Sequence, residues 1–188
     1  VPGDSEGLLR KDYPTVDGLR ASEVLLENVR VPASALVGAE GAASQTLNTV
    51  INRGILAISA EAVGAMAVLY QSTIDYTKQR VQFDHPLSEF QVVKHRLTEM
   101  FIEYNLAKSL CMKATMLLNQ NSGDAQRHIH ALKFLIGKTS RFVGQNAVQL
   151  HGGMGMTEDL AIAHYFKRLM MIDATFGHTD IHLDAFVQ

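Results

Sequence analysis

Three segments of the chain hold polar residues and glycines in patterns that suit binding of an anionic ligand. Residues 78–91 place the cationic Arg80 close to the aromatic Phe83, ahead of a turn. Residues 149–155 place three glycines at the end of a helical pattern, where exposed backbone N–H groups can meet phosphate oxygens. Residues 176–180 begin another helical pattern with hydroxyl and amide donors. Each segment by itself is better explained by a turn or a helix cap, so only their combination argues for a ligand.

Other site chemistries find little support. The closest pair among the eight histidines, His128 and His130, would point to nearly opposite sides of a helix. No glutamate is followed by a histidine three residues later, as a di-iron bundle requires, so we expect no metal site. The single cysteine, Cys111, lies between apolar neighbours and is expected in the core. The Gly-x-Ser-x-Gly turn of hydrolases and the Gly-x-Gly-x-x-Gly turn of dinucleotide-binding folds are both absent.

The composition predicts a folded protein without a strong charge. Hydrophobic residues make up 47% of the chain and charged residues 19%, and the net charge is −2. This leaves enough apolar material for a core, and no basic field that would attract nucleic acid or an anionic membrane. No uninterrupted apolar run reaches the roughly 18 residues that span a bilayer, and the first residues show no signal-peptide pattern. We expect a cytoplasmic protein without nucleic-acid or membrane partners and, because it does not begin with Met, one that starts inside a longer chain.

Hydrophobic spacing predicts a mainly α fold, an antiparallel four-helix bundle preceded by a short β segment. Prolines, glycines and short apolar stretches indicate β structure in residues 1–40, with a hairpin at Asp17-Gly18. We expect residues 1–40 to be the end of a β domain and residues 41–188 to be a helical domain. The helical stretches are expected at residues 42–80, 89–119, 125–150, 157–173 and after 177.

Local signals predict where these helices begin and end. Ser88-Glu89-Phe90-Gln91 fits a capping box that would begin the second helix, in which Phe101 and Leu106 are expected to be buried. Gly152-Gly153 suits the left-handed cap that would end the third helix. Thr157 would cap the fourth helix, with two acids in its first turn favoured by the helix dipole.

In this order and spacing, the segments resemble those of one family, the acyl-CoA dehydrogenases. The resemblance covers nearly the whole chain, which is similar to the C-terminal half of a family member. The fold it implies is the end of a middle β barrel, in residues 1–40, followed by the family's C-terminal four-helix bundle. The motifs that carry the resemblance are Arg80-x-x-Phe83, Pro86-Leu87, Phe90-Gln91, the run Val148–Gly155, Arg30-Val31-Pro32 and Leu36-Val37-Gly38.

The resemblance implies FAD as the cofactor, lying between barrel and bundle and crossing a subunit interface. By matching position, Arg80 would pair with the pyrophosphate, Phe83 would pack against the cofactor and Gln91 would hydrogen-bond it. Thr179 and Asp180 would lie near the phosphates. The far end of a neighbouring subunit's FAD would be received by Gln149, Leu150, His151, Gly152 and Gly153.

The residue that would remove the substrate's α proton is missing from both of its usual places. The implied reaction needs a carboxylate to take this proton while the β hydrogen leaves as hydride to the flavin. The usual glutamate position, just before the glycine of the last motif, is Phe176 here. The alternative position, just before Arg53 on the first long helix, is Asn52. Neither side chain can act as a base, so the catalytic residue is unknown, with Asp173 and Asp180 the nearest acids.

The resemblance therefore implies FAD-dependent α,β-dehydrogenation of an acyl-CoA thioester, with this chain as an incomplete-site subunit of a heteromeric enzyme. Residues 161–169 and Phe176 resemble the small subunits of such enzymes. Two alternatives stay open: another acid of this chain is the base, or the chain is a non-catalytic FAD-binding or assembly subunit. The partners implied are an acyl-CoA substrate, a flavoprotein electron acceptor, and further subunits in a homo- or hetero-oligomer, a dimer or tetramer.

Overall fold

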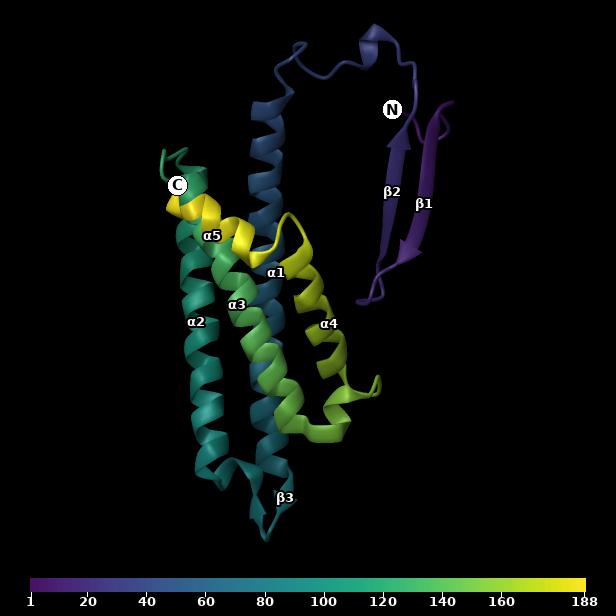
Figure 1. The fold of residues 1–188 in the computed structure, drawn as a ribbon. Helices are drawn as coiled ribbons and strands as arrows, with labels where there is room; N and C mark the ends of the chain where they lie inside the picture. The colour runs from purple at the N-terminus through teal and green to yellow at the C-terminus, as the bar shows by residue number, and fades with distance from the viewer. The chain divides into compact units, whose positions relative to one another are not determined.

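The computed structural model describes all 188 residues of the chain. They divide into two compact units, Val1–Val50 and Ile51–Gln188, and the division falls inside the first long helix. The smaller unit contains a β hairpin and the larger unit a bundle of helices (Figure 1). The predicted fold class, a helical bundle preceded by a short β segment, is confirmed. The domain boundary near residue 40 stays a prediction.

The β hairpin forms where turn residues separate two short extended stretches. Strands β1 (Leu8–Pro14) and β2 (Arg20–Leu26) pair antiparallel along the full length of both. In the turn between them Gly18 has a φ of +81°, a conformation that costs glycine little, and Asp17 accepts a hydrogen bond from the hydroxyl of Thr15. The hairpin predicted at Asp17-Gly18 is therefore confirmed.

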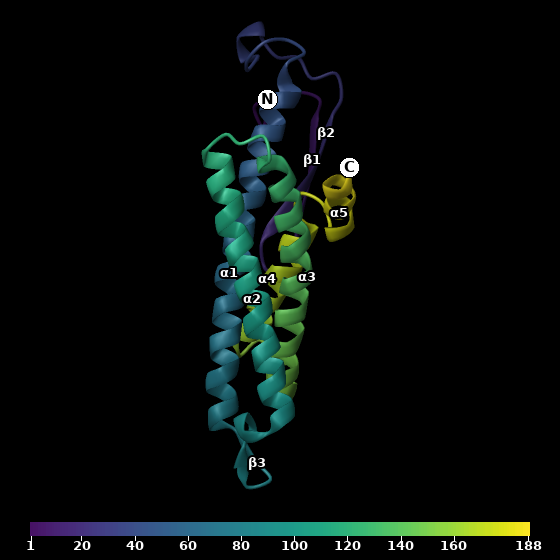
Figure 2. The same ribbon diagram turned by 90° about the vertical axis from the view of Figure 1, so that its left-hand side faces the viewer.

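Five helices follow, and the third of them is the central one. Helices α2, α4 and α5 all pack against α3, and α1 runs alongside α2 and α3 in both views (Figures 1 and 2). The long helices alternate in direction because short connections join them. Their bounds are α1 Ala43–Gln79, α2 Gln91–Asn119, α3 Ala125–His151, α4 Ala161–Ala174 and α5 Thr179–Val187.

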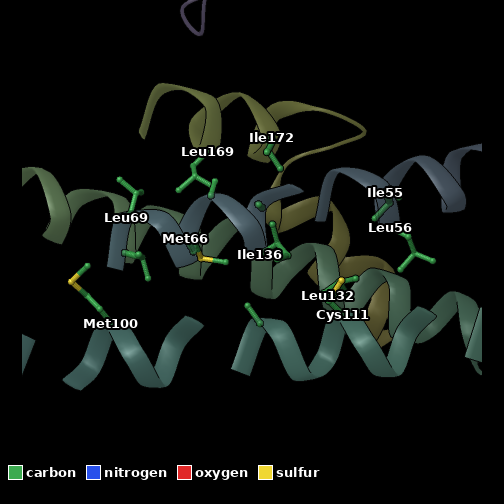
Figure 3. Packing of buried hydrophobic residues seen from close by; sticks show 14 of the residues in the cluster. Ile55, Leu56, Met66, Leu69, Met100, Cys111, Leu132, Ile136, Leu169 and Ile172 are labelled. Carbon is green, nitrogen blue, oxygen red and sulfur yellow. The ribbon is translucent and has the colours of Figure 1, made fainter. Parts of the chain in front are cut away.

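The core lies where α1, α2, α3 and α4 face one another. Met66 and Leu69 from α1, Met100 from α2, Ile136 from α3 and Leu169 from α4 are all completely buried there (Figure 3). Burying one such side chain stabilises a fold by about 1.5–3 kcal/mol. This packing holds the helices beside one another, and so it also fixes the turns between them.

Helix α2 begins differently from the prediction. A 3₁₀ turn, Leu87–Glu89, comes first, and Phe90 then stands at the N-cap in an extended conformation without a side-chain cap. Gln91 is thus the first helical residue, and its amide caps nothing. The predicted capping box is wrong because the 3₁₀ turn uses the residues that would have formed it.

Helix α4 also begins later than predicted. Thr157 donates its hydroxyl back to the carbonyl of Met154 at 2.9 Å, which closes the 3₁₀ turn Gly152–Met156. The hydroxyl is therefore not the cap of a following helix, and α4 begins at Ala161 with Leu160 at its N-cap. A bond to the preceding turn competes successfully here with the capping role predicted for Thr157.

The long helices leave apolar residues at the surface. Phe101 and Leu106 of α2, which were expected to be buried, are 49% and 51% exposed, and the ring of Phe101 lies only partly against Tyr70 of α1, with centroids 5.7 Å apart. Helix α1 contains an 18-residue window with a mean hydropathy of 1.4, long and apolar enough to cross a bilayer by length and composition. This is weak evidence for a membrane span, since core helices of soluble bundles pass the same test. The expectation that no stretch reaches this length holds only for uninterrupted apolar runs.

Candidate functional site

The predicted site residues fall into two clusters at different levels of the helix bundle. Figure 1 shows the β3 hairpin and the end of α3 at one end of the bundle, with the turn between α4 and α5 much farther up. From Gly137, which lies beside that turn, to His151 the distance along α3 is about 20 Å by the rise of an α-helix. The hairpin-end cluster contains Arg80, Phe83, Gln91, Gln149, Leu150, His151, Gly152 and Gly153. The turn cluster contains Asn52, Phe176, Thr179 and Asp180.

The hairpin-end cluster is built around a tight two-residue loop. Strands β3 (Val81–Gln82) and β4 (His85–Pro86) pair antiparallel, and Phe83 and Asp84 between them have φ values of +55° and +65°. Two successive positive φ values define the loop that matches the twist of a hairpin, and glycine or asparagine usually occupies it. Asp84 takes the place that is usually glycine in the family that the motif resembles. The loop holds the Phe83 ring 85% exposed, with only the edge-on ring of Phe90 beside it at 6.4 Å between centroids.

Two hydrogen-bond donors of this cluster are free. The backbone of Arg80 ends α1 by donating to the carbonyl of Tyr76 at 2.9 Å, and its own carbonyl accepts the N–H of Leu87 at 2.8 Å. The Arg80 side chain is exposed and forms no ion pair, and the Gln91 side chain is exposed and forms no hydrogen bond. An arginine and an amide are thus presented to solvent on either side of the hairpin.

The end of α3 is fixed to the last turn of α1. The ring of His151 stacks on Tyr76 with centroids 4.3 Å apart, and the Tyr76 hydroxyl donates to the His151 carbonyl at 3.4 Å. The His151 side chain is buried and its Nδ1 lies 2.8 Å from the Ala147 carbonyl, so the imidazole belongs to the bundle interior. Gly152 ends the helix with a φ of +63° and a ψ of −142°, so the predicted end at this glycine is right, but the conformation is an extended one with positive φ and not the left-handed helical cap that was expected. A Cβ atom at Gly152 or Gly153 would meet nothing within 4 Å, so the space above these glycines is open.

In the turn cluster, one usual position of a catalytic base, Phe176, lies against helix α1. Phe176 has a φ of +59°, and its ring lies directly on Gly54, where an added Cβ atom would be 2.8 Å from the Phe176 Cζ. Asn52, the other usual position, precedes Gly54 by two residues on α1 and therefore points to a different side of the helix. The aromatic side chain of Phe176 thus packs the α4–α5 turn against α1 at Gly54.

The nearest acids are not placed as a free base in this site. Asp173 is buried; its Oδ1 accepts the hydroxyl of Thr179 at 2.7 Å, and its Oδ2 lies 3.2 Å from an Arg141 guanidinium nitrogen. Asp180 is exposed in the first turn of α5. Both acids line a pocket of about 310 Å³ that also contains Lys138. Asp173 is thus a structural carboxylate that holds the start of α5.

Comparison with known proteins decides the family. Residues 40–188 match the family described as "Acyl-CoA dehydrogenase, C-terminal domain". The chain belongs to the acyl-CoA dehydrogenase family. It is 30% identical over 184 residues to the probable acyl-CoA dehydrogenase YngJ of Bacillus subtilis. The matched residues make up 96% of this chain and 48% of that protein. The chain thus spans about half the length of the curated relatives it matches.

Solved structures agree in fold. A structure described as PigA with FAD and proline superposes with a TM-score of 0.93 at 24% identity, covering all of this chain and 49% of PigA. The ChsE4-ChsE5 complex from Mycobacterium tuberculosis gives a TM-score of 0.89 at 22% identity, covering all of this chain and 50% of the solved chain. At these identities the likeness shows the fold alone. FAD is the cofactor of the acyl-CoA dehydrogenase family.

The hairpin end of this chain fits an anionic cofactor better than the start of α5 does. Arg80 and Gln91 are free donors, and the space above Gly152-Gly153 is open. In contrast, the hydroxyl of Thr179 is already donated within the chain, and Asp180 would bring a negative charge close to phosphate. As cofactor-binding residues, the members of the hairpin-end cluster and Thr179 and Asp180 of the turn cluster stay predictions.

Sequence reasoning missed a buried polar network behind the Phe176–Gly177 turn. Lys133 of α3 is completely buried, and its Nζ donates to the carbonyls of Asp173 and Gly177, each at 2.8 Å. Burial lowers the pKa of the Lys133 ammonium, and the Asp173 carboxylate offsets part of this effect. His182 of α5 and His130 of α3 complete the network, with their Nδ1 atoms 3.0 Å apart. The lysine and the histidines meet partners about 40 residues or more away, so no local motif could reveal them.

Proposed function

We propose that this chain is the C-terminal part of an FAD-dependent enzyme that dehydrogenates an acyl-CoA thioester between its α and β carbons. We propose further that it is the incomplete-site subunit of a heteromeric enzyme. The observation that carries the second step is the Phe176 ring, which lies on Gly54 at the place where the base would stand. Membership of the acyl-CoA dehydrogenase family supports the first step.

The hairpin end would hold the cofactor. The Arg80 guanidinium would form charge-assisted hydrogen bonds with the pyrophosphate, and Gln91 would add an amide contact. Phe83 would offer its exposed ring as an apolar surface. The turn cluster is about 20 Å farther along the bundle, so the two clusters of one chain do not form one compact site. This separation supports the expectation that each cofactor is shared between two subunits.

The base would come from a partner subunit. FAD, when bound, supplies the acceptor for the hydride that leaves the β carbon. Removal of the α proton needs a carboxylate within hydrogen-bond reach, and Phe176 and Asn52 have none. Asp173 already accepts the Thr179 hydroxyl and lies beside Arg141, so it is not a free acceptor. In this proposal the chain binds and orients the ligand and excludes water, while the partner takes the proton.

The second candidate function is a non-catalytic FAD-binding or assembly subunit of the same family. It is favoured by the same Phe176 ring, because an aromatic side chain that fills the site of the base also leaves less room for a substrate. Under either function we expect a homo- or hetero-oligomer. For the catalytic function we also expect a flavoprotein electron acceptor and a cytoplasmic location.

Anaerobic visible spectra of the full-length parent, alone and with candidate partner subunits, test these proposals. Bleaching of the flavin by acyl-CoA only when a partner is present would support the heteromeric enzyme. Bleaching by the parent alone would refute the need for a partner's base, and an oxidised flavin across a broad acyl-CoA panel would favour the non-catalytic subunit.

A matched pair of variants sharpens the test. Phe176→Glu places a carboxylate in the turn, and Phe176→Gln places an isosteric amide there. If the base is what the site lacks, only Phe176→Glu should gain substrate-dependent bleaching without a partner. Equal behaviour of the two variants, both bleached or both inert with FAD still bound, would contradict this assignment.

A further inference from the structure

Side chains behind the α4–α5 turn hold it in an uncommon conformation. Phe176 and Gly177 have φ values of +59° and +101°, and such a φ is costly for a bulky residue unless its surroundings enforce it. Lys133 holds the Gly177 carbonyl from α3. The Nε2 atom of His182, on α5, lies 2.9 Å from the Phe176 carbonyl.

The contacts of His182 determine where its hydrogen lies. A carbonyl oxygen only accepts hydrogen bonds, so the Nε2 atom of His182 must carry the hydrogen that Phe176 accepts. In neutral His182 the Nδ1 atom is then an acceptor. The Nδ1 atom of His130 lies 3.0 Å away and must be the donor. Because His182 is only 3% exposed, water does not readily replace this partner.

We propose that His182 is a positioning residue for the Phe176–Gly177 turn, and that His130 fixes the tautomer in which His182 holds this turn. As a statement about catalysis, this inference rests on the proposed function, because the turn stands where the base would be. As a statement about the position of the turn, it stands on the contacts alone.

The pair is also sensitive to protons. A first added proton can bind the Nε2 atom of His130 and leave the hydrogen bond between the two Nδ1 atoms in place, but a second, on Nδ1 of His182, leaves two N–H donors facing each other. The rings, whose centroids are 5.2 Å apart, would then both be cationic and would lie beside the Lys133 ammonium. His130 lines a pocket of about 440 Å³, so protons from solvent can reach the pair.

Burial lowers the pKa of both histidines below the ordinary value of 6.5. The Lys133 ammonium and His130 lower the pKa of His182 further, while the Phe176 carbonyl and the Asp173 carboxylate raise it. The remaining charged groups around the pair are Arg127 of α3, which lines the pocket with His130, and the exposed Asp180 and Asp184 of α5.

The direction of the pH effect follows from these shifts. Between the lowered pKa of the folded state and about 6.5, the unfolded chain binds more protons than the folded one. The contribution of the pair to stability is therefore complete above about pH 6.5 and is lost as the pH falls below it. The hold on the turn should weaken in the same window.

Hydrogen–deuterium exchange of the full-length protein, read by mass spectrometry, tests the inference. Exchange at the backbone amides of peptides covering residues 174–184 reports the turn, and exchange at the imidazole carbon between the nitrogens reports each histidine's titration. The variants are His182→Leu, which removes the donor, His182→Gln, which can still donate, and His130→Gln, which cannot titrate. His128→Gln is the control, because His128 lies on the same helix and contacts only the Asp124 carbonyl.

At neutral pH, His182→Leu should speed exchange in these peptides about tenfold, whereas His182→Gln and His128→Gln should stay close to wild type. After correction for intrinsic rates, wild-type protection should fall below pH 6.5, and His130→Gln should remove most of that fall. His130 and His182 should both titrate below the ordinary pKa of 6.5. Equal protection in His182→Leu and wild type, or equal loss in His182→Leu and His182→Gln, would overturn the positioning role.

If His182→Leu does not fold, the pH dependence of backbone exchange still tests the inference, because this measurement needs only the wild-type protein and His130→Gln. An unchanged pH dependence in His130→Gln would overturn the role of His130. If the parent shows no flavin bleaching with any partner, the proposed function fails, but these exchange results still decide the inference.

Discussion

The hairpin end and the α4–α5 turn differ in how far their polar groups are satisfied within the chain. At the hairpin end, the Arg80 and Gln91 side chains are exposed and unpaired. Behind the turn, Lys133 makes two hydrogen bonds to carbonyls and Thr179 is bonded to Asp173. Free polar groups can bind a ligand from outside the chain, whereas bonded ones mainly hold the fold.

Both regions contain a phenylalanine with positive φ, but the same backbone conformation directs the two rings differently. Phe83 is held outward by a tight hairpin, with one aromatic neighbour and an exposed ring. Phe176 lies with its ring against Gly54, although it is still 45% exposed, and the backbone of its turn is held by contacts from α3 and α5. The hairpin end thus presents groups to a partner or cofactor, while the turn closes the place where a catalytic base would stand.

The largest effect is expected where polar groups are buried. Lys133→Ala removes two hydrogen bonds and leaves a cavity under the turn, so it should lower the free energy of unfolding by about 3–5 kcal/mol. Chemical denaturation of the full-length protein measures this loss. Lys138→Ala, at an exposed position five residues further along α3, should change stability by less than about 0.5 kcal/mol. Similar losses in both variants would contradict the structural role of Lys133.

At the hairpin end the same kind of change should affect binding and leave stability intact. Arg80→Ala should weaken FAD binding by about 1.5–3 kcal/mol, the range for hydrogen bonds to charged groups, which is roughly 10- to 100-fold. Flavin content after dialysis and the dissociation constant from fluorescence titration of the full-length protein measure the effect. Lys113→Ala, an exposed cation of α2 outside both clusters, is the control. Unchanged flavin retention in Arg80→Ala would remove the cofactor from the hairpin end.

The elements that sequence predicts well are those with local causes. The end of α3 follows from Gly152, because glycine readily takes the φ of +63° found there. The start of α4 does not follow from Thr157, because its hydroxyl has two possible partners and only the folded turn decides between them. For α2, the spacing of apolar residues indicates a helix, but it does not show which of its faces other helices cover. Phe101 and Leu106 are apolar and yet exposed for this reason.

The two clusters show the same limit. The residues of the hairpin end come from motifs that can be read along the chain, whereas the network behind the turn joins residues distant in sequence. His130 and His182 are 52 residues apart, and nothing in either helix by itself indicates that the two side chains meet. One hint was present: Lys133 follows the core residue Ile129 by four residues, which places an ionisable group on the buried stripe of α3.

A smaller effect is expected at the contact between Phe176 and α1. Gly54→Ala would place a Cβ atom 2.8 Å from the Phe176 ring, so it should destabilise the protein by about 1–3 kcal/mol or displace the ring. Gly64→Ala is the matched control, because nothing lies within 4 Å of its added Cβ, and it should stabilise α1 by about 0.5–1 kcal/mol. Thermal denaturation gives both values. Combining Gly54→Ala with Phe176→Ala should recover most of the loss; strictly additive losses would show that the two residues do not meet.

The smallest effect is expected at Asp84, the acid in the loop beside Arg80. Its carboxylate is exposed, so its repulsion of a phosphate is screened by water and salt. Asp84→Gly should therefore tighten FAD binding only about two- to threefold, through loss of the charge and relief of the left-handed backbone. Asp84→Asn separates these causes, because asparagine removes the charge and also tolerates a positive φ. Equal tightening in both variants assigns the effect to charge, and tightening in Asp84→Gly alone assigns it to the backbone. Weaker binding in both would show that the carboxylate contributes to the site, and the hairpin end would then not be the purely cation- and amide-lined surface described above.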